Sequence, residues 1–363
     1  MKVTVAMDSF KGSLTSLEAG NAVRDGILLA RPDAEVTVLP TADGGEGTLD
    51  AIAPFIDAAA RPFRVRGPLG EIIDSYYIFS DSDSTAYIEM AKASGITLVP
   101  EKDLDICNSS TFGTGELIRD AISKGFRRIV VFLGGSATND GGAGMLSALG
   151  GRFLDKDGKP VPYGATGLSD LCSIDTTGLI GTDIAFIAAT DVTNPLCGPS
   201  GASHVYGPQK GATYEMAEKM DLWLMNMAKL AGADPDVPGY GAAGGCGFAL
   251  MHFLGAKLES GADIVAKITG LEDAVRDCDI VITGEGRMDG QTINGKAPYR
   301  IMKTAARYGK RTIGVCGITG EGWEKCLAAG FDQVVPLKDP SMEKDSAIIS
   351  VAKTVADLFA ADK

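Results

Sequence analysis

The first forty residues alternate between short apolar runs and a segment with helical spacing. Residues 3–7 and 35–39 are apolar enough to form buried strands, and residues 17–29 between them repeat apolar positions every three or four residues. This pattern predicts a strand, a helix and a second strand. Because the connections are short, the order favours a parallel α/β sheet.

The last quarter of the chain repeats that pattern. Strands are predicted over residues 280–283, 312–316 and 333–336, with helical stretches between them and a final helix over 345–359. Both ends therefore have the same parallel α/β character. We expect them to form one domain together, with a second α/β domain inserted between them.

The predicted secondary structure is different in the segment between the two ends. Residues 63–66, 72–79 and 85–90 read as strands without intervening helices, which predicts an antiparallel or mixed sheet. Alternation then returns, with predicted strands at 128–133 and 184–189 and predicted helices at 115–123, from 142, at 214–230, at 245–254 and from 261. A chain of 363 residues is long enough for two domains. The expected division is residues 1–80 with 280–363, and residues 81–279.

Composition limits the class of protein. Hydrophobic residues make up 45% and charged residues 22%, the balance of a globular enzyme, and the net charge is −13. That acidity argues against nucleic acid or an anionic membrane as partner. The start reads as a strand, and no apolar run is long enough to cross a bilayer. We expect a soluble, cytoplasmic protein, and a homo-oligomer is compatible with the sequence.

Cysteine and histidine offer little chemistry. The seven cysteines lie far apart and form no C-x-x-C pair, so the sequence indicates neither a disulfide framework nor a zinc site. His204 and His252 sit in no metal-type or Ser-His-Asp-type pattern, and His252 has the neighbours of a packed helix residue. Proton transfer is therefore assigned to a carboxylate.

A glycine and hydroxyl run, Leu133–Gly144, lies between an apolar strand and a predicted helix. Glycines let the backbone turn tightly and expose its N–H groups, and the start of a helix adds positive dipole. The run predicts a site for a small anion. The structural alternative is a turn that only packs the helix against the strand.

Two N-terminal strands also end in polar turns. After the first come Asp8 and Lys11, where a ligand crevice is expected at the carboxyl ends of parallel strands. After the second come Asp43 and Glu46, carboxylates on a glycine turn that suit Mg²⁺. The alternatives are helix capping, by Asp8 or Ser13 in the first turn, and by Asp43 with Glu46 as capping-box partner in the second.

Two later turns have the same character. Asp191 follows the predicted strand at 184–189, and the segment 283–296 follows the strand at 280–283 and carries Arg287, Asp289 and Lys296. Residues 290–296 nearly match a P-loop, but Ala297 replaces the hydroxyl that would bind Mg²⁺ and the strand lies too far upstream, so a P-loop fold is rejected. Strand-end carboxylates with nearby cations fit phosphoryl transfer, which needs positioning, charge neutralisation and one base.

Together these turns resemble the bacterial glycerate kinases of the GarK/GlxK type. The similarity runs along the whole chain, in order, in the segments Asp8–Leu14, Ala42–Thr48, Gly134–Gly142, Asn194–Gly198 with Gly207–Gly211, and Thr283–Arg287 with Gly295 and Lys296. The resemblance implies two α/β domains with the active site in the cleft between them. It implies ATP- and Mg²⁺-dependent phosphorylation of D-glycerate, usually at the 2-hydroxyl to give 2-phosphoglycerate.

The resulting hypothesis assigns roles to the residues in these turns. Asp191 or Asp8 takes the proton of the glycerate hydroxyl, with Lys11 as a further catalytic candidate; Asp43 and Asp289 hold Mg²⁺. The candidates for binding substrate and phosphates are Ser9, Gly134, Gly135, Ser136, Thr138, Asn139, Asn194, Lys210, Arg287 and Lys296. The alternatives are phosphorylation at the 3-hydroxyl, a non-catalytic hydroxy-acid binding protein, and a Mg²⁺-dependent phosphatase.

Overall fold

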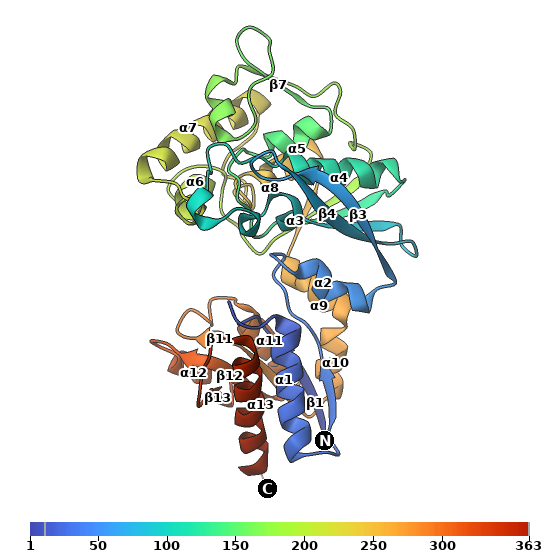
Figure 1. Ribbon diagram of the computed structural model, residues 1–363, viewed down its shortest axis with the longest axis vertical. Coiled ribbons are helices and arrows are strands. Elements are labelled where there is room, and N and C mark those ends of the chain that lie inside the picture. Colours follow the sequence, from blue (N-terminus) through green and yellow to red (C-terminus); the bar gives the residue numbers. More distant parts are fainter. Residues whose placement is uncertain (11, 362–363) are drawn as a thin grey trace. The chain divides into compact units, whose positions relative to one another are not determined.

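The computed structural model describes residues 1–10 and 12–361 (Figure 1). The chain divides into two compact units, and each has its own sheet. The terminal unit consists of Met1–Ala42 and Ala262–Lys363, and the central unit of Asp43–Gly261. Helices and strands alternate in both units and most strand pairs are parallel, which confirms the predicted α/β class.

The terminal unit has a five-stranded sheet in the order β13-β12-β11-β1-β2, and every described pair in it is parallel. The strands are β1 (Lys2–Met7), β2 (Glu35–Val38), β11 (Ile280–Met288), β12 (Arg311–Thr319) and β13 (Gln333–Pro336). The helices are α1 (Ser16–Ala30), α9 (Gly261–Thr269, which begins at the last residue of the central unit), α10 (Leu271–Asp277), α11 (Ala297–Arg307), α12 (Glu324–Ala329) and α13 (Lys344–Ala361).

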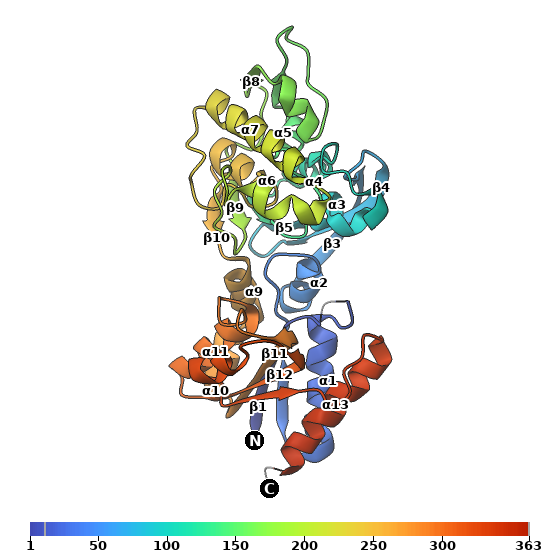
Figure 2. The ribbon, with the colours of Figure 1, turned by 90° about the vertical axis from the view of Figure 1, so that its left-hand side faces the viewer.

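Helices cover both faces of this sheet. α1 and α13 lie side by side on one face, and α10 and α11 lie on the other (Figure 2). The α1–α13 contact is close because a Cβ on Gly26 would come within 2.3 Å of the Ala352 carbonyl oxygen. The first face buries Val5, Ile27 and Val351, and the second buries Met302 and Cys316. The alternating apolar strands of the sequence are therefore the middle layer of an α/β/α sandwich.

The chain enters α1 through a capping box. Thr15 accepts a hydrogen bond from the Glu18 backbone N–H, and Glu18 accepts one from the Thr15 N–H. Lys344 also donates to the Glu18 carboxylate. The hydrogen bond from Lys344 and the one from the Thr15 backbone lower the pKa of Glu18 below its ordinary value.

Replacing Glu18 with glutamine tests how much the charge of Glu18 contributes to the stability of the fold. Glutamine can still accept the Thr15 N–H, so the change removes the charged bond to Lys344 and should cost about 0.3–1 kcal/mol of unfolding free energy near pH 7. The pKa of Glu18 is lower in the folded protein than its ordinary value, so the charged carboxylate stabilises the fold at pH values above that ordinary value. This stabilisation is lost as the pH falls through the pKa of the folded state. Urea unfolding curves of the two proteins should therefore converge in acid. A difference that stayed constant with pH would contradict this assignment.

The central unit has a six-stranded mixed sheet in the order β10-β9-β6-β5-β4-β3. β10, β9, β6 and β5 are parallel, and the β5–β4 and β4–β3 pairs are antiparallel. The strands are β3 (Ala58–Arg66), β4 (Ile72–Ser80), β5 (Thr85–Glu89), β6 (Arg128–Phe132), β9 (Ala185–Ala189) and β10 (Lys257–Glu259), with a separate hairpin of β7 (Arg152–Leu154) and β8 (Ser173–Asp175). The predicted mixed sheet over residues 63–90 is confirmed.

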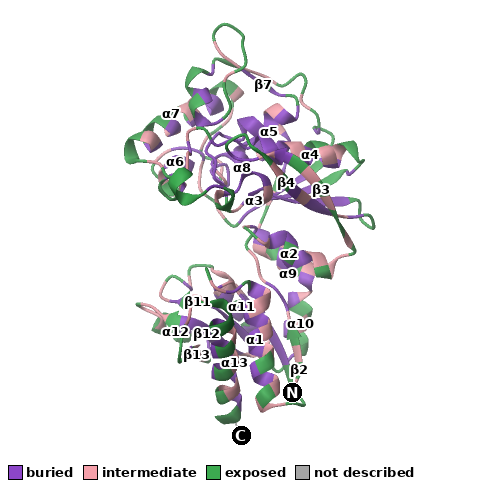
Figure 3. Cartoon of the chain, viewed as in Figure 1, coloured by how far each residue is buried: buried purple, intermediate pink, exposed green. Residues whose placement is uncertain are grey.

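Helices and short helical turns complete the central unit. The helices are α2 (Thr48–Ile52), α3 (Ala91–Ser94), α4 (Phe112–Ser123), α5 (Ala143–Ala148), α6 (Ala202–Tyr206), α7 (Tyr214–Ala231) and α8 (Cys246–Phe248), followed directly by a π-helical turn over Ala249–Phe253. The middle strands of both sheets are buried, and exposed residues gather on the outer helices and loops (Figure 3). The core of the central unit includes Ile88, Val131, Ala188, Leu146 and Phe248.

Three features differ from the sequence-based expectations. β11 continues through Met288 instead of ending at 283, because residues 285–288 pair with β12. The predicted helix at 245–254 is a short α-helix followed by a π-helical turn. The compact units change over at 42/43 and 261/262, whereas the expected domain boundaries were 80/81 and 279/280. β3 and β4 belong with the central unit because they pair through β4 with β5.

Most of the cysteines are buried. Cys197, Cys246, Cys278, Cys316 and Cys326 are buried, Cys107 is half-buried, and Cys172 is exposed. Among residues 1–10 and 12–361, no helix combines the length and apolar character needed to cross a membrane.

Candidate functional site

In the terminal unit, two of the motif segments meet at the carboxyl edge of the sheet. From β1 the chain moves to β2 on one side, and from β11 it moves through β12 to β13 on the other. The strand order therefore reverses between β1 and β11, and in open α/β sheets ligands bind at such a switch point. The backbone N–H of Asp8 donates to the Gly284 carbonyl at 2.8 Å. Asp8 therefore lies next to Gly284 of β11, three residues before Arg287.

Glu285 is a buried acid at this edge that sequence reasoning missed. It is 8% exposed, accepts a 2.7 Å hydrogen bond from the Thr292 hydroxyl through Oε1, and pairs with Lys296 Nζ at 3.0 Å through Oε2. Lys296 is the residue before α11, and its side chain is 38% exposed. The ion pair holds a predicted phosphate-binding lysine over the strand end while leaving it accessible. The thirteen residues after 283 contain two acids and two cations, and this density is the signal that could have identified Glu285.

Arg287 and Asp289 lie at the end of β11 and just beyond it. Arg287 is exposed, and its Nε lies 3.4 Å from Asp289 Oδ2. Asp289 Oδ1 accepts the Gln291 N–H at 2.8 Å, so this carboxylate also shapes its own turn. The sequence placed Arg287 in a turn after the strand; the structure puts it on the strand, paired in register with Ile318.

The capping alternatives for the first turn are wrong. α1 is capped by Thr15, whereas Asp8 accepts the Ser9 N–H at 2.7 Å and the Ser13 hydroxyl donates to the Ser341 carbonyl. Asp8 and Ser9 are both half-buried at the strand end. Lys11, the remaining candidate of this turn, lies outside the described residues.

In the central unit, the turn 43–47 packs directly on the turn 134–136. A Cβ on Gly134 would lie 2.4 Å from the Gly45 Cα and 2.8 Å from the Gly44 carbonyl oxygen. A Cβ on Gly44 would meet the Ala189 carbonyl oxygen at 3.2 Å. Two motif segments that are about ninety residues apart in the sequence therefore touch, and they do so at the carboxyl edge of β6 and β9.

Gly134→Ala should separate these two turns. Backbone atoms cannot yield to a methyl group at 2.4 Å as a flexible side chain could. We expect kcat/KM to fall by about a hundredfold, because displacements near 1 Å in a binding site cost that much. The matched control is Gly158→Asn, since Gly158 has positive φ and open space around it, and asparagine tolerates that conformation. Equal activity of both variants would show that the close contact is unimportant.

The acidic residues of turn 43–47 do not cap α2. The N-cap of α2 is Gly47 and makes no side-chain bond, so the capping alternative for Asp43 and Glu46 is wrong. Asp43 is exposed and accepts the Gly45 N–H at 2.9 Å, and Glu46 accepts the Thr97 hydroxyl at 3.1 Å. The start of α2 is instead satisfied by Glu89, a fully buried acid that the sequence analysis did not single out.

The turn after β6 presents backbone N–H groups. Within the described residues, the N–H groups of Gly134, Gly135 and Ser136 donate to no protein acceptor. The Glu46 nitrogen lies 3.8 Å from where a Gly135 Cβ would be, so the neighbouring turn comes close to these groups. Thr138 Oγ1 and Asn139 Oδ1 are buried and also have no partner in the described part of the chain. The three N–H groups of Gly134, Gly135 and Ser136 suit an anion.

Lys210 supports this turn from the buried side. It is 2% exposed, and its Nζ donates to Ser136 Oγ and to the Thr138 carbonyl, each at 2.7 Å. Burial lowers the pKa of Lys210 to about 7, against the opposing effect of the Asp140 charge. Lys210 was predicted to bind phosphate, and the structure shows its amino group bonded to the turn itself.

Asp140 is the most extensively bonded acid of this region, and the sequence did not identify it. It is fully buried and accepts hydrogen bonds from the backbone N–H groups of Thr111, Gly142 and Gly144 and from the Thr111 hydroxyl. Burial raises its pKa in spite of these bonds. Asp140 therefore ties the start of α4 to the start of α5 beneath the glycine turn.

Asp191 follows β9 at the same edge of the sheet. It is exposed, and its Oδ1 accepts a hydrogen bond from the Ser260 hydroxyl, which follows β10. Asn194 acts locally, because its amide donates to the Ser200 carbonyl and accepts from the Tyr206 hydroxyl. The described candidates thus form two sets. Asp8, Ser9, Arg287, Asp289 and Lys296 belong to the terminal unit, and Asp43, Gly134, Gly135, Ser136, Thr138, Asn139, Asp191, Asn194 and Lys210 belong to the central unit.

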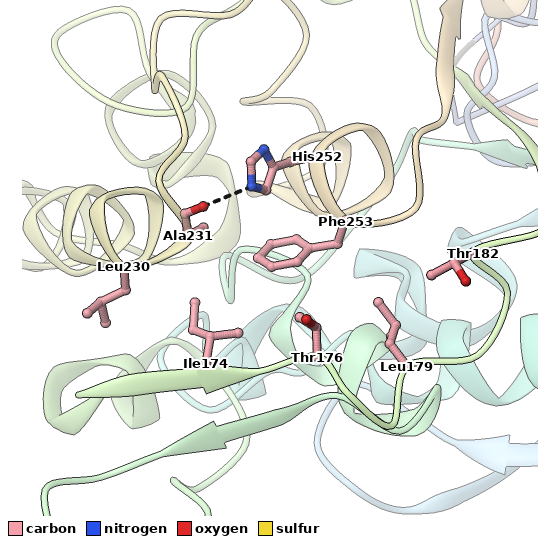
Figure 4. Close-up of a pocket in the computed structure, with 8 residues that line it drawn as sticks. All are labelled: Ile174, Thr176, Leu179, Thr182, Leu230, Ala231, His252 and Phe253. Atoms are coloured by element: carbon pink, nitrogen blue, oxygen red, sulfur yellow. Dashed lines mark hydrogen bonds between the residues drawn. The ribbon is translucent and has the colours of Figure 1, made fainter.

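A separate cavity of about 350 Å³ lies between the end of α7 and the π-helical turn (Figure 4). His252 lines it, with Nε2 3.2 Å from the Ala231 carbonyl and its ring stacked on Phe248. These contacts confirm His252 as a packed helix residue. The other lining residues are Ile174, Thr176, Leu179, Thr182, Leu230, Ala231 and Phe253. The described site candidates are not among them.

Comparisons with known proteins place the chain in a family. A model of the glycerate kinase family matches residues 3–361. The chain is 45% identical to glycerate 2-kinase of Escherichia coli K12 over 87% of this chain and 85% of that protein. It is 39% identical to a glycerate kinase of Halalkalibacterium halodurans over 98% and 97%. A crystal structure from Salmonella typhimurium LT2, assigned as a glycerate kinase 2, matches with a TM-score of 0.85 and 42% identity, over 99% of this chain and 98% of that one. With a family model that spans nearly its whole length, the chain belongs to the glycerate kinase family.

Proposed function

We propose that this protein transfers the γ-phosphoryl group of ATP to the 2-hydroxyl of D-glycerate, giving 2-phosphoglycerate and ADP. The observation that carries the proposal is the set of backbone N–H groups at Gly134, Gly135 and Ser136, which lack protein acceptors within the described residues and lie at the end of β6. Such groups bind phosphate or carboxylate oxygens without requiring a positive net charge, which matters in a chain with a net charge of −13.

The proton of the reacting hydroxyl goes to a carboxylate. The 2-oxygen of glycerate attacks the γ-phosphorus, the bond from that phosphorus to the bridging oxygen of ADP breaks, and Asp191 or Asp8 accepts the hydroxyl proton. Asp191 is exposed at a strand end and held by Ser260. Asp8 is half-buried at the switch point of the other sheet. Both lie close to the end of a strand, because Asp8 comes one residue after β1 and Asp191 two residues after β9.

Cationic side chains neutralise the substrates. We assign Lys296 and Arg287 to the phosphates and the glycerate carboxylate, with Lys11 in the same role from the family resemblance. Lys296 is suited because Glu285 orients it while more than a third of its side chain stays exposed. Removing such charges from a phosphoryl-transfer site weakens the stabilisation of the transition state.

Mg²⁺ is the metal that we propose for the reaction. The described residues contain no cluster of three or more His, Cys, Asp or Glu side chains that could hold a metal. Mg²⁺ is commonly bound by one or two carboxylates together with substrate phosphates. The proposed ligands are Asp43 of the central unit and Asp289 of the terminal unit, since each has one oxygen on a backbone N–H and keeps further lone pairs. When bound, Mg²⁺ would neutralise phosphate charge.

A coupled assay tests the proposal. Protein, Mg-ATP and D-glycerate are mixed with enolase, which consumes 2-phosphoglycerate directly. We expect enolase product and glycerate-dependent ADP. A signal only after phosphoglycerate mutase is added would place the phosphoryl group on the 3-hydroxyl. Glycerate binding without ADP would indicate a binding protein, and phosphate release from phosphoglycerate without nucleotide would indicate a phosphatase.

A further inference from the structure

We propose that Glu89 is a positioning residue for this phosphoryl transfer. Its buried carboxylate holds the turn 43–47 in the shape that ligand binding requires. The inference rests on the proposed function, because it gives that turn a role in binding the substrates of the reaction. Glu89 itself is assigned no contact with substrate.

Both oxygens of the Glu89 carboxylate accept backbone hydrogen bonds where this turn leads into α2. Glu89 is the last residue of β5 and is 0% exposed. Its Oε1 accepts the Gly47 N–H at 3.1 Å, and its Oε2 accepts the Leu49 N–H at 3.0 Å. One rigid strand end therefore fixes two backbone groups just after Asp43 and Glu46.

A nearby cation compensates the buried charge. Lys92 opposes the burial that raises the pKa of Glu89. Lys92 Nζ donates to Asp50 Oδ2 at 3.1 Å, and Asp50 also accepts the Tyr76 hydroxyl at 2.6 Å. Because Asp50 is on α2, this network ties the helix to β4 and α3 while Glu89 ties its first turn to β5.

The position of turn 43–47 matters to the neighbouring turn. Gly45 and Gly44 lie where a Gly134 side chain would otherwise be, and the Glu46 nitrogen lies near Gly135. A shift of the first turn would therefore displace the N–H groups presented by the second. Burying a carboxylate costs free energy, and apolar replacements of buried ionic groups are often neutral for stability. We infer that Glu89 serves to hold the backbone of the turns 43–47 and 134–136 in accurate positions.

The test compares Glu89→Gln with a matched control. Glutamine keeps the length of the side chain, but its NH₂ group opposes one of the two N–H donors. The control is Glu116→Gln, since Glu116 also accepts a backbone N–H, from Arg66 at 2.8 Å, but lies on α4. Steady-state kinetics are measured well below the melting temperature of each variant, so that all molecules are folded.

We expect Glu89→Gln to lower kcat/KM for ATP or for D-glycerate by about tenfold or more, and Glu116→Gln to leave both near the wild-type values. If Glu89→Gln folds and has wild-type kinetics, Glu89 is only structural and the inference fails. If Glu89→Gln does not fold, Lys92→Met is used. It should reduce kcat/KM about threefold or more, and wild-type kinetics for it would overturn the inference. Absence of glycerate-dependent ADP with wild-type protein would instead reject the proposed function.

Discussion

Asp191→Asn should lower kcat by about two to four orders of magnitude if Asp191 is the general base, because this is the usual contribution of proton transfer to a positioned side chain. Asparagine keeps the shape of the side chain and its bond to Ser260, so the fold and the KM values should change little. Asp8→Asn makes the same test for the other candidate. Rapid-quench measurement of ADP formation would separate the chemical step from product release.

The chain provides a matched control for this experiment. Asp183 is exposed just before β9, and Asp191 follows the opposite end of the same strand. Asp183→Asn should therefore retain full turnover. If Asp191→Asn and Asp8→Asn both keep near-wild-type kcat, neither aspartate is the base and the mechanism must be reassigned.

Asp140→Ala should destabilise the protein by on the order of 3–5 kcal/mol, the largest stability effect we expect from a single substitution. The change leaves three backbone N–H groups and the Thr111 hydroxyl without their acceptor in a fully buried site. Each unsatisfied buried donor costs about 1–3 kcal/mol, partly recovered by relaxation. Denaturant unfolding measures the difference as a lower midpoint.

Asp155→Ala separates this effect from the loss of an ordinary turn-forming aspartate. Asp155 also accepts two backbone N–H groups, from Asp157 and Lys159, but these donors lie at the surface, where water can replace the carboxylate. A loss of about 1 kcal/mol is expected there. Comparable losses at Asp140 and Asp155 would mean that burial does not determine the cost.

The positions of many helices and strands could be predicted from the local spacing of apolar residues. β1, β2, α1 and α13 lie where apolar spacing placed them, within one or two residues at each end. The pairing of the strands could not be predicted from this spacing, because pairing depends on contacts between residues that are distant in the sequence. β3 and β4 read as strands, but the sequence does not show that β4 pairs with β5 and so belongs with the central unit. This pairing is the physical reason why the first boundary lies at 42/43 and not at 80/81.

Only some of the residues of the candidate site could be predicted from the sequence, for a related reason. Polar residues after apolar strands indicated Asp8, Asp43 and Asp191, and the structure places each at the carboxyl edge of a sheet. Glu89 and Asp140 were missed, because a carboxylate is ordinarily exposed and only the tertiary structure shows that these two are buried against backbone N–H groups. Lys210 was singled out as a phosphate-binding candidate, but only the structure shows that it is buried with its amino group bonded to Ser136 and Thr138.

The sheet order of the terminal unit has a consequence for synthesis of the protein. β1 lies between β2 and β11, and the Lys2 N–H donates to Asp279, 277 residues further along the chain. On the ribosome, β1 therefore lacks one neighbour until β11 (Ile280–Met288) has been made. Residues 43–261 are contiguous and need no such delay. We expect the inserted segment to fold first and the chain ends to join last.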